Sequence, residues 1–578
     1  MTRFRTSLST LLLALALAPL PGAAQEAAAE PEAAATEPAQ DLFLDTVDVN
    51  VVNVDVYVTD REGKPITGLT AGDFELFENG RPMALTNFYA IEDRKVAVAG
   101  TEPPAEGEPE APAEAPGVEP AEEGLPEDQR LSLVVYVDNL NIRPHNRRRV
   151  LQDTRAFLRR ELTRDDRVML ITYERALHVR VPFTTDSERV VEALFEVDEL
   201  SGMAVHSDSE RRDVLQRIED AESGAEAIMW AETHAESVRN DLHFTIDALR
   251  EMVSSLAGLP GRKAVLYVSD GVPMVAGEDI FYAVDQRFQH TGAMTRLYTY
   301  DSSRRFEELA AHANGNRVSF YTVDAAGLRV HSSADVQAFQ ADRAGGWSHI
   351  DSIRTRNLQA SLQLLAEQTG GKAIINQNRV EQALQQVASD FRTYYSLGYS
   401  PGHSGDGRYH RIEVRLKDRS RDYRVRHREG YRDKPASAQM SEGVLAALNF
   451  PHHSNPLELA LSFGEGLRRD DGHFLVPVNL RIPIRSLTLV PRGEVYEASA
   501  QLWLAARDEK GWVSEVQQAQ LPVRVPEAEL EEALQKDYVY TVQILLRSGE
   551  QKVAIGVRDE ITANNSFVTG TVFLGSGS

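Results

Sequence analysis

The chain has 578 residues, enough for several domains, because single apolar cores stop growing near about 250–300 residues. It contains no cysteine, which excludes disulfides, thiolate metal sites and cysteine nucleophiles. The formal net charge is −25, but 14 of the acids lie in two stretches without bases, 25–40 and 98–128, so the folded parts are only mildly acidic; this charge, together with the export predicted below, argues against nucleic acid as a partner.

The first 24 residues carry the three parts of a secretory signal. Arg3 and Arg5 precede the apolar run LLLALALAPL, and small residues follow at 22–24. The run is too short for a comfortable membrane span, so residues 1–24 predict a signal peptide and an exported protein, periplasmic or secreted. An uncleaved anchor is the alternative interpretation.

Two stretches rich in alanine, proline and glutamate, 25–40 and 98–128, hold too few bulky apolar residues to fold and are expected to be disordered spacers. Between them, residues 41–97 predict an N-terminal β domain. TVDVNV alternates polar and apolar residues, Asn79-Gly80 is a hairpin dipeptide, and LTNFYAI is typical of a strand.

Residues 129–400 change to short apolar strands separated by helical patterns. The predicted strands are LSLVVYV (131–137), RVMLITY (167–173), LHVRVPF (177–183), KAVLYVS (263–269), VSFYTVD (318–324) and KAIIN (372–376). This pattern predicts an α/β fold with a doubly wound, mostly parallel sheet covered by helices on both faces. LHVRVPF follows RVMLITY closely and is expected to be an antiparallel edge. Residues 201–240 and 271–316 are polar, largely helical insertions.

The chain then returns to β structure. Residues 401–434 predict a β meander. The segments 41–97 and 391–433 are expected to pack together, which would make the central domain an insertion in one β module. Regular short strands with turn signals between them predict a β-sandwich over 451–578.

Acidic residues follow several of the predicted parallel strands. Asp138 comes directly after the first strand, Asp270 after the strand 263–269, and Asp324 ends the strand 318–324. Ligands of open α/β sheets bind outside the carboxyl ends of the strands. Three aspartates at one sheet edge favour a hard cation, which takes oxygen ligands.

Several sequence motifs occur in order over roughly residues 41–433. They are VDVYVTDREGKPITGLTAGDFELFENG, the aspartate after the first strand, GRKAVLYVSDG, VSFYTVDAAGL, LAEQTGGKAI, and YYSLGYSPG followed by YHRIEVRLKD and YRVRHREGY. Together they resemble a von Willebrand factor A domain, and in particular the exported proteins related to it that are found notably in acidobacteria. The C-terminal β segment is a looser match.

The resemblance implies a metal-ion-dependent adhesion site, with Asp-x-Ser-x-Ser after the first strand, a threonine from a later loop and a further aspartate. Asp138 matches the first aspartate and Asp270 the last. The two serine positions hold leucine and isoleucine (Leu140 and Ile142), which cannot ligate a metal. The family pattern places His243 at the threonine position, and Thr245 stands two residues further along.

Two interpretations of this degenerate site follow. In the first, Asp138 and Asp270 hold Mg²⁺ or Ca²⁺, and the shell is completed by water, by Asn139 or Asn141, and by Thr245. In the second, the aspartates are structural carboxylates that accept hydrogen bonds from loop N–H groups or pair with nearby arginines, Arg143 and Arg147.

The sequence predicts an exported, non-enzymatic protein that binds another protein or an envelope surface component through the carboxyl edge of its sheet. The alternative is a structural or assembly factor of the cell envelope with no bound ion. An enzyme is not expected, because Ser269-Asp270-Gly271 has no histidine at a defined spacing to form a hydrolase triad.

Overall fold

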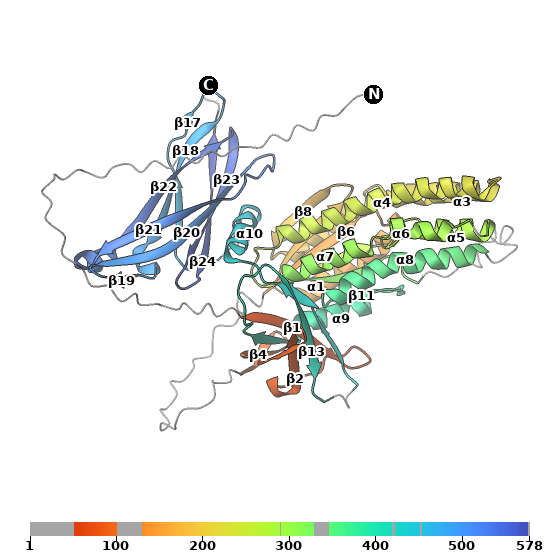
Figure 1. The fold of residues 1–578 in the computed structure, drawn as a ribbon, viewed down its shortest axis with the longest axis horizontal. Coiled ribbons are helices and arrows are strands. Elements are labelled where there is room, and N and C mark those ends of the chain that lie inside the picture. Colours follow the sequence, from red (N-terminus) through yellow and green to blue (C-terminus); the bar gives the residue numbers. More distant parts are fainter. Residues whose placement is uncertain are drawn as a thin grey trace. The chain divides into compact units, whose positions relative to one another are not determined.

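The part of the chain that the structure describes divides into two compact units, one that ends at Pro435 and one that begins at Ala436. A computed structural model describes residues 51–100, 130–163, 165–289, 291–328, 346–418, 422–450 and 454–575 (Figure 1). The predicted signal peptide and the spacer 25–40 lie outside the described residues, as does most of the spacer 98–128.

A six-stranded sheet forms the centre of the first unit. In sheet order its strands are β11 (Lys372–Ile374), β10 (Val318–Asp324), β9 (Arg262–Ser269), β6 (Leu131–Asp138), β7 (Arg167–Tyr173) and β8 (Leu177–Thr184). All neighbours pair in parallel except β7 and β8, which confirms the predicted antiparallel edge. Every residue of β6, β7 and β9 is buried, which explains their nearly continuous apolar sequences.

The chain enters this sheet in the middle, at β6, runs outward to β7 and β8, and returns to β9 on the other side of β6. The loops after β6 and β9 therefore lead in opposite directions from adjacent strands. Helices α1 (Pro144–Glu161), α2 (Ser187–Asp198) and α9 (Glu381–Arg392) share one apolar core with the sheet. Helices α7 (Ser303–Gly315) and α8 (Gly346–Gln368) contact β10.

The two insertions form one helical lobe with α8. Its further elements are α3 (Ala204–Asp220), α4 (Gly224–Ser255), α5 (Glu278–Arg287), η3 (Ala293–Arg296) and α6 (Leu297–Tyr300). Figure 1 shows α3, α4, α5 and α8 running side by side beyond the sheet. Small and apolar side chains from both insertions, such as Ala231, Phe281 and Tyr300, bury one another. The insertions are thus a single packed feature and not separate polar loops.

The flanking β segments form a module of two antiparallel sheets. One sheet has the order β14 (Arg424–His427), β1 (Val52–Thr59), β12 (Tyr394–Tyr399), β4 (Asn87–Glu92) and β5 (Lys95–Gly100), and the other has the order β15 (Gly430–Arg432), β13 (Tyr409–Leu416), β2 (Phe74–Glu78) and β3 (Arg81–Met83). Strands from before the α/β part thus pair directly with strands from after it. Because β12 lies in this module, the α/β part ends before Tyr394 and not at residue 400.

Arg262 joins the β module to the start of β9. Its guanidinium donates to Asp55 Oδ2 at 3.1 Å and to Tyr57 Oη at 2.9 Å. It also lies 3.7 Å from the ring centroid of Tyr394. Only 9% of the residue is exposed, and the guanidinium also donates to the carbonyls of Asp390 and Phe391 in α9, so this buried cation links the module to the α/β part.

The second unit contains two antiparallel sheets that share one apolar core, the packing of a β-sandwich. Its strands are β16 (Ala460–Phe463), β17 (Leu467–Arg468), β18 (Phe474–Pro483), β19 (Val490–Arg492), β20 (Val495–Asp508), β21 (Gln517–Pro526), β22 (Asp537–Leu546), β23 (Gly549–Asp559) and β24 (Asn565–Leu574). Helix α10 (Ala436–Asn449) packs against Trp503. Among the described helices, none is long and apolar enough to cross a membrane.

Candidate functional site

Asp138 lies at the carboxyl end of β6, next to the strand β9 that leads to Asp270. This is the point where the chain path reverses across the sheet, and open α/β sheets bind ligands at such points. Both residues are buried, with 0% and 6% exposure respectively. The predicted pair of aspartates therefore does lie at one edge of the sheet.

The Asp138 carboxylate is surrounded by protein donors. Its Oδ2 atom accepts from Tyr267 Oη at 2.6 Å, Asn141 Nδ2 at 3.0 Å and Ser269 Oγ at 3.2 Å. Its Oδ1 atom accepts from the Asn141 N–H and from Asn141 Nδ2, both at 3.2 Å. Burial raises the pKa of Asp138, and these hydrogen bonds oppose the rise. The carboxylate therefore fixes the turn that follows β6.

Asp270 is held against the beginning of α1. Its Oδ2 atom accepts from Asn146 Nδ2 at 2.8 Å and from the Arg143 N–H at 3.2 Å. The Arg143 guanidinium lies 3.7 Å away and adds a charge interaction. Asp270 therefore ties the β9 loop to the loop after β6, as the interpretation of the aspartates as structural carboxylates predicts.

The other predicted ligands are also engaged. Asn139 Oδ1 accepts from Arg147, and its Nδ2 donates to the Ser201 carbonyl at 3.1 Å. Thr245 is fully buried in α4, where its hydroxyl donates to the Asp241 carbonyl at 3.0 Å. The Asn139 amide and the Thr245 hydroxyl thus each have protein partners of their own.

This donor set is a poor fit for Mg²⁺ or Ca²⁺. Leu140 and Ile142, at the positions where the adhesion-site motif has serines, are buried apolar side chains. Asp324, the third aspartate of this edge, accepts from Gln359 Nε2 at 2.8 Å and from the Ala326 N–H at 3.0 Å. A hard cation needs six or more oxygen ligands, including water, and would have to compete with these hydrogen bonds. The predicted ion at this edge stays a prediction.

A cleft with room for about 130 Å³ opens beside Asp270. Its walls come from the loops after β6 and β9 and from α3, α4, α5 and α8, so the helical lobe forms most of it. Three arginines and five carboxylates line the cleft: Arg143, Arg211, Arg354, Asp208, Glu210, Asp241, Asp270 and Asp279. Burial lowers the pKa of the cleft residue His234, which disfavours its charged form, and the lining holds two more carboxylates than arginines.

Ion pairs organise the inner part of this cleft. Asp208 accepts from Arg143 at 2.6 Å and from Arg354 at 2.8 Å. Burial alone would raise the pKa of Asp208, but these two guanidinium groups outweigh it and lower the pKa to about 2. Arg211 pairs with Asp279 at 2.6 Å. The cleft therefore remains charged at any physiological pH.

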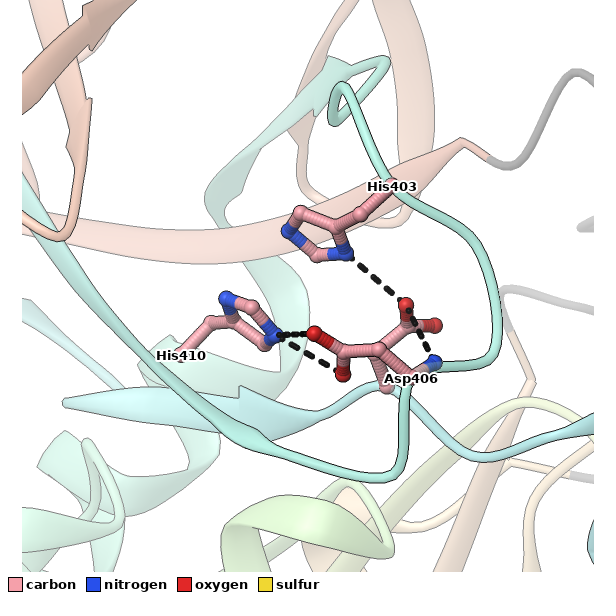
Figure 2. A group of neighbouring side chains, drawn as sticks. His403, Asp406 and His410 are labelled. Carbon is pink, nitrogen blue, oxygen red and sulfur yellow. Dashed lines mark hydrogen bonds and ion pairs between the residues drawn. The ribbon is translucent and has the colours of Figure 1, made fainter.

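A second group of polar side chains lies in the β module (Figure 2). His403, Asp406, His410 and Asp433, called here the histidine–aspartate cluster, each offer one ligand atom, and these atoms all lie within 4.8 Å of one another. Such a cluster could hold a metal ion. Sequence reasoning missed it, although the spacing His-x-x-Asp-x-x-x-His in HSGDGRYH is a detectable signal.

Comparisons with known proteins leave the family open. No protein-family model matches the chain, and no curated protein matches it. Solved structures similar to this chain include an aerotolerance-related membrane protein from Bacteroides fragilis, with 11% identity, 46% of this chain and 98% of that chain covered, and a TM-score of 0.22. BatB from Bacteroides thetaiotaomicron shows 13% identity, with 45% and 98% covered and a TM-score of 0.21.

A mutant of the PilB minor pilin from Streptococcus sanguinis shows 12% identity, with 55% of this chain and 77% of that chain covered and a TM-score of 0.24. At TM-scores this low, the likenesses support no conclusion about activity or partner. A proposal of function must therefore rest on the residues at the sheet edge and not on these similar structures.

Proposed function

We propose that this chain is an exported, non-enzymatic binding protein of the von Willebrand factor A type, with a doubly wound central domain that captures a protein partner at the carboxyl edge of its sheet. The observation that carries the proposal is the charged cleft beside Asp270, which lies where the chain path reverses and is walled by the helical lobe. Binding sites of open α/β sheets lie at this position.

The contacts at this edge favour direct recognition without a bound ion. Asp138 and Asp270 already accept hydrogen bonds from β9, from the loop after β6 and from the start of α1, so the loops are pre-organised without metal. Glu210 and Asp241, which contact His206 and Arg175 outside the lining, offer negative charge to a basic side chain of the partner. Glu210, an exposed residue of α3 on the cleft wall, is the most accessible of these carboxylates.

The cleft residues support binding more than catalysis. Ser207 and Ser237 line the cleft together with His234, but no hydrogen bond joins either serine to that histidine among the described residues. A nucleophile needs such a base within reach. We therefore assign the cleft to recognition.

Site-specific photo-crosslinking in the envelope of the producing cell tests the proposal. A photoreactive amino acid at the exposed cleft position Ser237 is expected to give a discrete protein adduct. The same probe at Lys510, an exposed turn of the second unit, serves as the control. Adducts that are identical from both positions, or absent from Ser237, would contradict the proposal.

A further inference from the structure

The donors of the histidine–aspartate cluster come from a short loop, from the start of β13 and from the residue after β15. His403 and Asp406 lie between β12 and β13, His410 lies in β13, and Asp433 directly follows β15. Gly405 adopts a φ of +65°, a left-handed conformation that lets the loop fold back on itself. The loop closes onto Asp433, whose Oδ2 atom accepts from the Asp406 N–H at 3.3 Å.

The chemistry of these donors selects a class of metal. Imidazole nitrogens suit zinc and other late first-row ions, whereas Mg²⁺ and Ca²⁺ prefer shells of oxygen alone. Zinc binds imidazole nitrogen and carboxylate oxygen at about 2.0–2.2 Å, so neighbouring donors in a tetrahedral shell lie about 3.4 Å apart. In the cluster, His403 Nδ1 lies 2.8 Å from Asp433 Oδ2, and His410 Nε2 lies 3.1 Å from Asp406 Oδ1.

An outer layer of hydrogen bonds contacts one of the histidines. His403 Nε2 contacts Glu78 Oε2 at 3.1 Å. The other oxygen of Glu78 accepts from Tyr399 Oη at 2.8 Å and from Tyr431 Oη at 2.9 Å. A metal-bound histidine commonly donates its second N–H to a carboxylate held in this way.

We propose that the histidine–aspartate cluster is a structural Zn²⁺ site, with His403 Nδ1, His410 Nε2 and one oxygen each of Asp406 and Asp433 as ligands. Four protein ligands leave no open position, which is typical of a structural site and not of a catalytic one. The ion would tie the loop before β13 to the end of β15 and, through Glu78, to β2. This inference is independent of partner binding at the sheet edge.

Two local adjustments accompany zinc binding. The rings of His403 and His410 are stacked, with centroids 3.8 Å apart and planes at 16°, and one ion cannot lie in the planes of two rings stacked in this way. The His403 side chain is 24% exposed and the His410 side chain 8%, so His403 is the ring that tilts. Zinc on His410 Nε2 also places the proton on Nδ1, so the contact with Asn79 Nδ2 at 3.0 Å is given up, while Asn79 Oδ1 keeps the Arg411 N–H as its donor.

The test uses the full chain without a histidine tag, treated with EDTA and then dialysed. Calorimetric titration with ZnCl₂ is expected to show one ion bound per chain, and X-ray absorption is expected to show two imidazole ligands. At zinc concentrations about 100-fold above the Kd, unfolding of the first unit should shift upward by about 3 °C. Failure of the treated wild type to bind zinc would overturn the proposal.

Matched variants locate the ion. The double variant His403→Gln/His410→Gln should lose zinc binding, while His206→Gln, at a side chain that is 80% exposed, should retain it. Because the double variant could fold poorly, Asp406→Asn on the surface loop is the second test and should weaken zinc binding at least tenfold. Zinc affinity unchanged in Asp406→Asn and in a folded double variant would overturn the assignment.

Discussion

Replacement of Asp138 by alanine distinguishes a structural role of this carboxylate from a role as a metal ligand. The substitution removes the acceptor of the Tyr267 hydroxyl, the Ser269 hydroxyl and two donors of Asn141. A buried donor left without an acceptor costs about 1–3 kcal/mol, and part of this cost is offset because the ionised carboxylate no longer has to be buried. We therefore expect a net loss of about 3–5 kcal/mol in the free energy of unfolding of the first unit.

Amide hydrogen exchange of the peptide that spans β6 measures this loss directly. A loss of about 3–5 kcal/mol corresponds to exchange that is faster by about two to nearly four powers of ten. The control is Asp186→Ala, since this exposed N-cap carboxylate of α2 accepts from the Glu188 N–H and its loss should cost only about 1 kcal/mol. Unchanged protection of β6 in Asp138→Ala, together with Mg²⁺-dependent protection in the wild type, would refute the structural role.

Three further predictions concern other parts of the first unit. Arg262→Ala removes a buried guanidinium from Tyr57, from two α9 carbonyls and from the partly exposed Asp55, and should destabilise the unit by about 2–4 kcal/mol in urea unfolding, whereas an effect under 1 kcal/mol would contradict the contacts. Burial lowers the pKa of His312 from 6.5 to about 4, so the unfolded chain takes up a proton before the folded chain does, and stability falls as the pH drops from 6.5 to 4. The loss reaches at most about 3 kcal/mol and should be smaller in His312→Gln. Equal unfolding midpoints of the two proteins at every pH would show that His312 does not cause this loss. Gly371→Ala would place a methyl group on the Phe320 carbonyl and should cost at least about 2 kcal/mol, while a wild-type melting temperature would show that the backbone can move away.

The sequence predicted the central sheet well because its strands are buried on both faces. The predicted strands RVMLITY and VSFYTVD match β7 and β10 residue for residue. A strand that is buried on both faces is a continuous apolar run, so the polar residues around it mark both of its ends. The edge strand β8 was also predictable, because too few residues precede it for a crossover helix.

The candidate sites were less predictable because they depend on contacts distant in sequence. Asp138 and Asp270 could be placed at the sheet edge, but their partners Tyr267 and Asn146 follow from no spacing rule. The helical lobe makes the cleft, and nothing in the polar sequence of the two insertions indicates that they share a core. The histidine–aspartate cluster similarly depends on the pairing of β13 with β15, which brings Asp433 to the loop.

The most direct test of the assignment of the cleft to partner recognition compares two charge-reversal variants on the same helix. The quantity measured is the affinity of each variant for the partner that the crosslink identifies. Glu210→Arg changes the cleft wall, and Glu219→Arg changes an exposed position of α3 that does not line the cleft. Calorimetric titration is expected to show a Kd about tenfold weaker for Glu210→Arg, equivalent to about 1.4 kcal/mol, and a Kd within about twofold of the wild type for Glu219→Arg. Equal affinities of the two variants would contradict binding at the cleft.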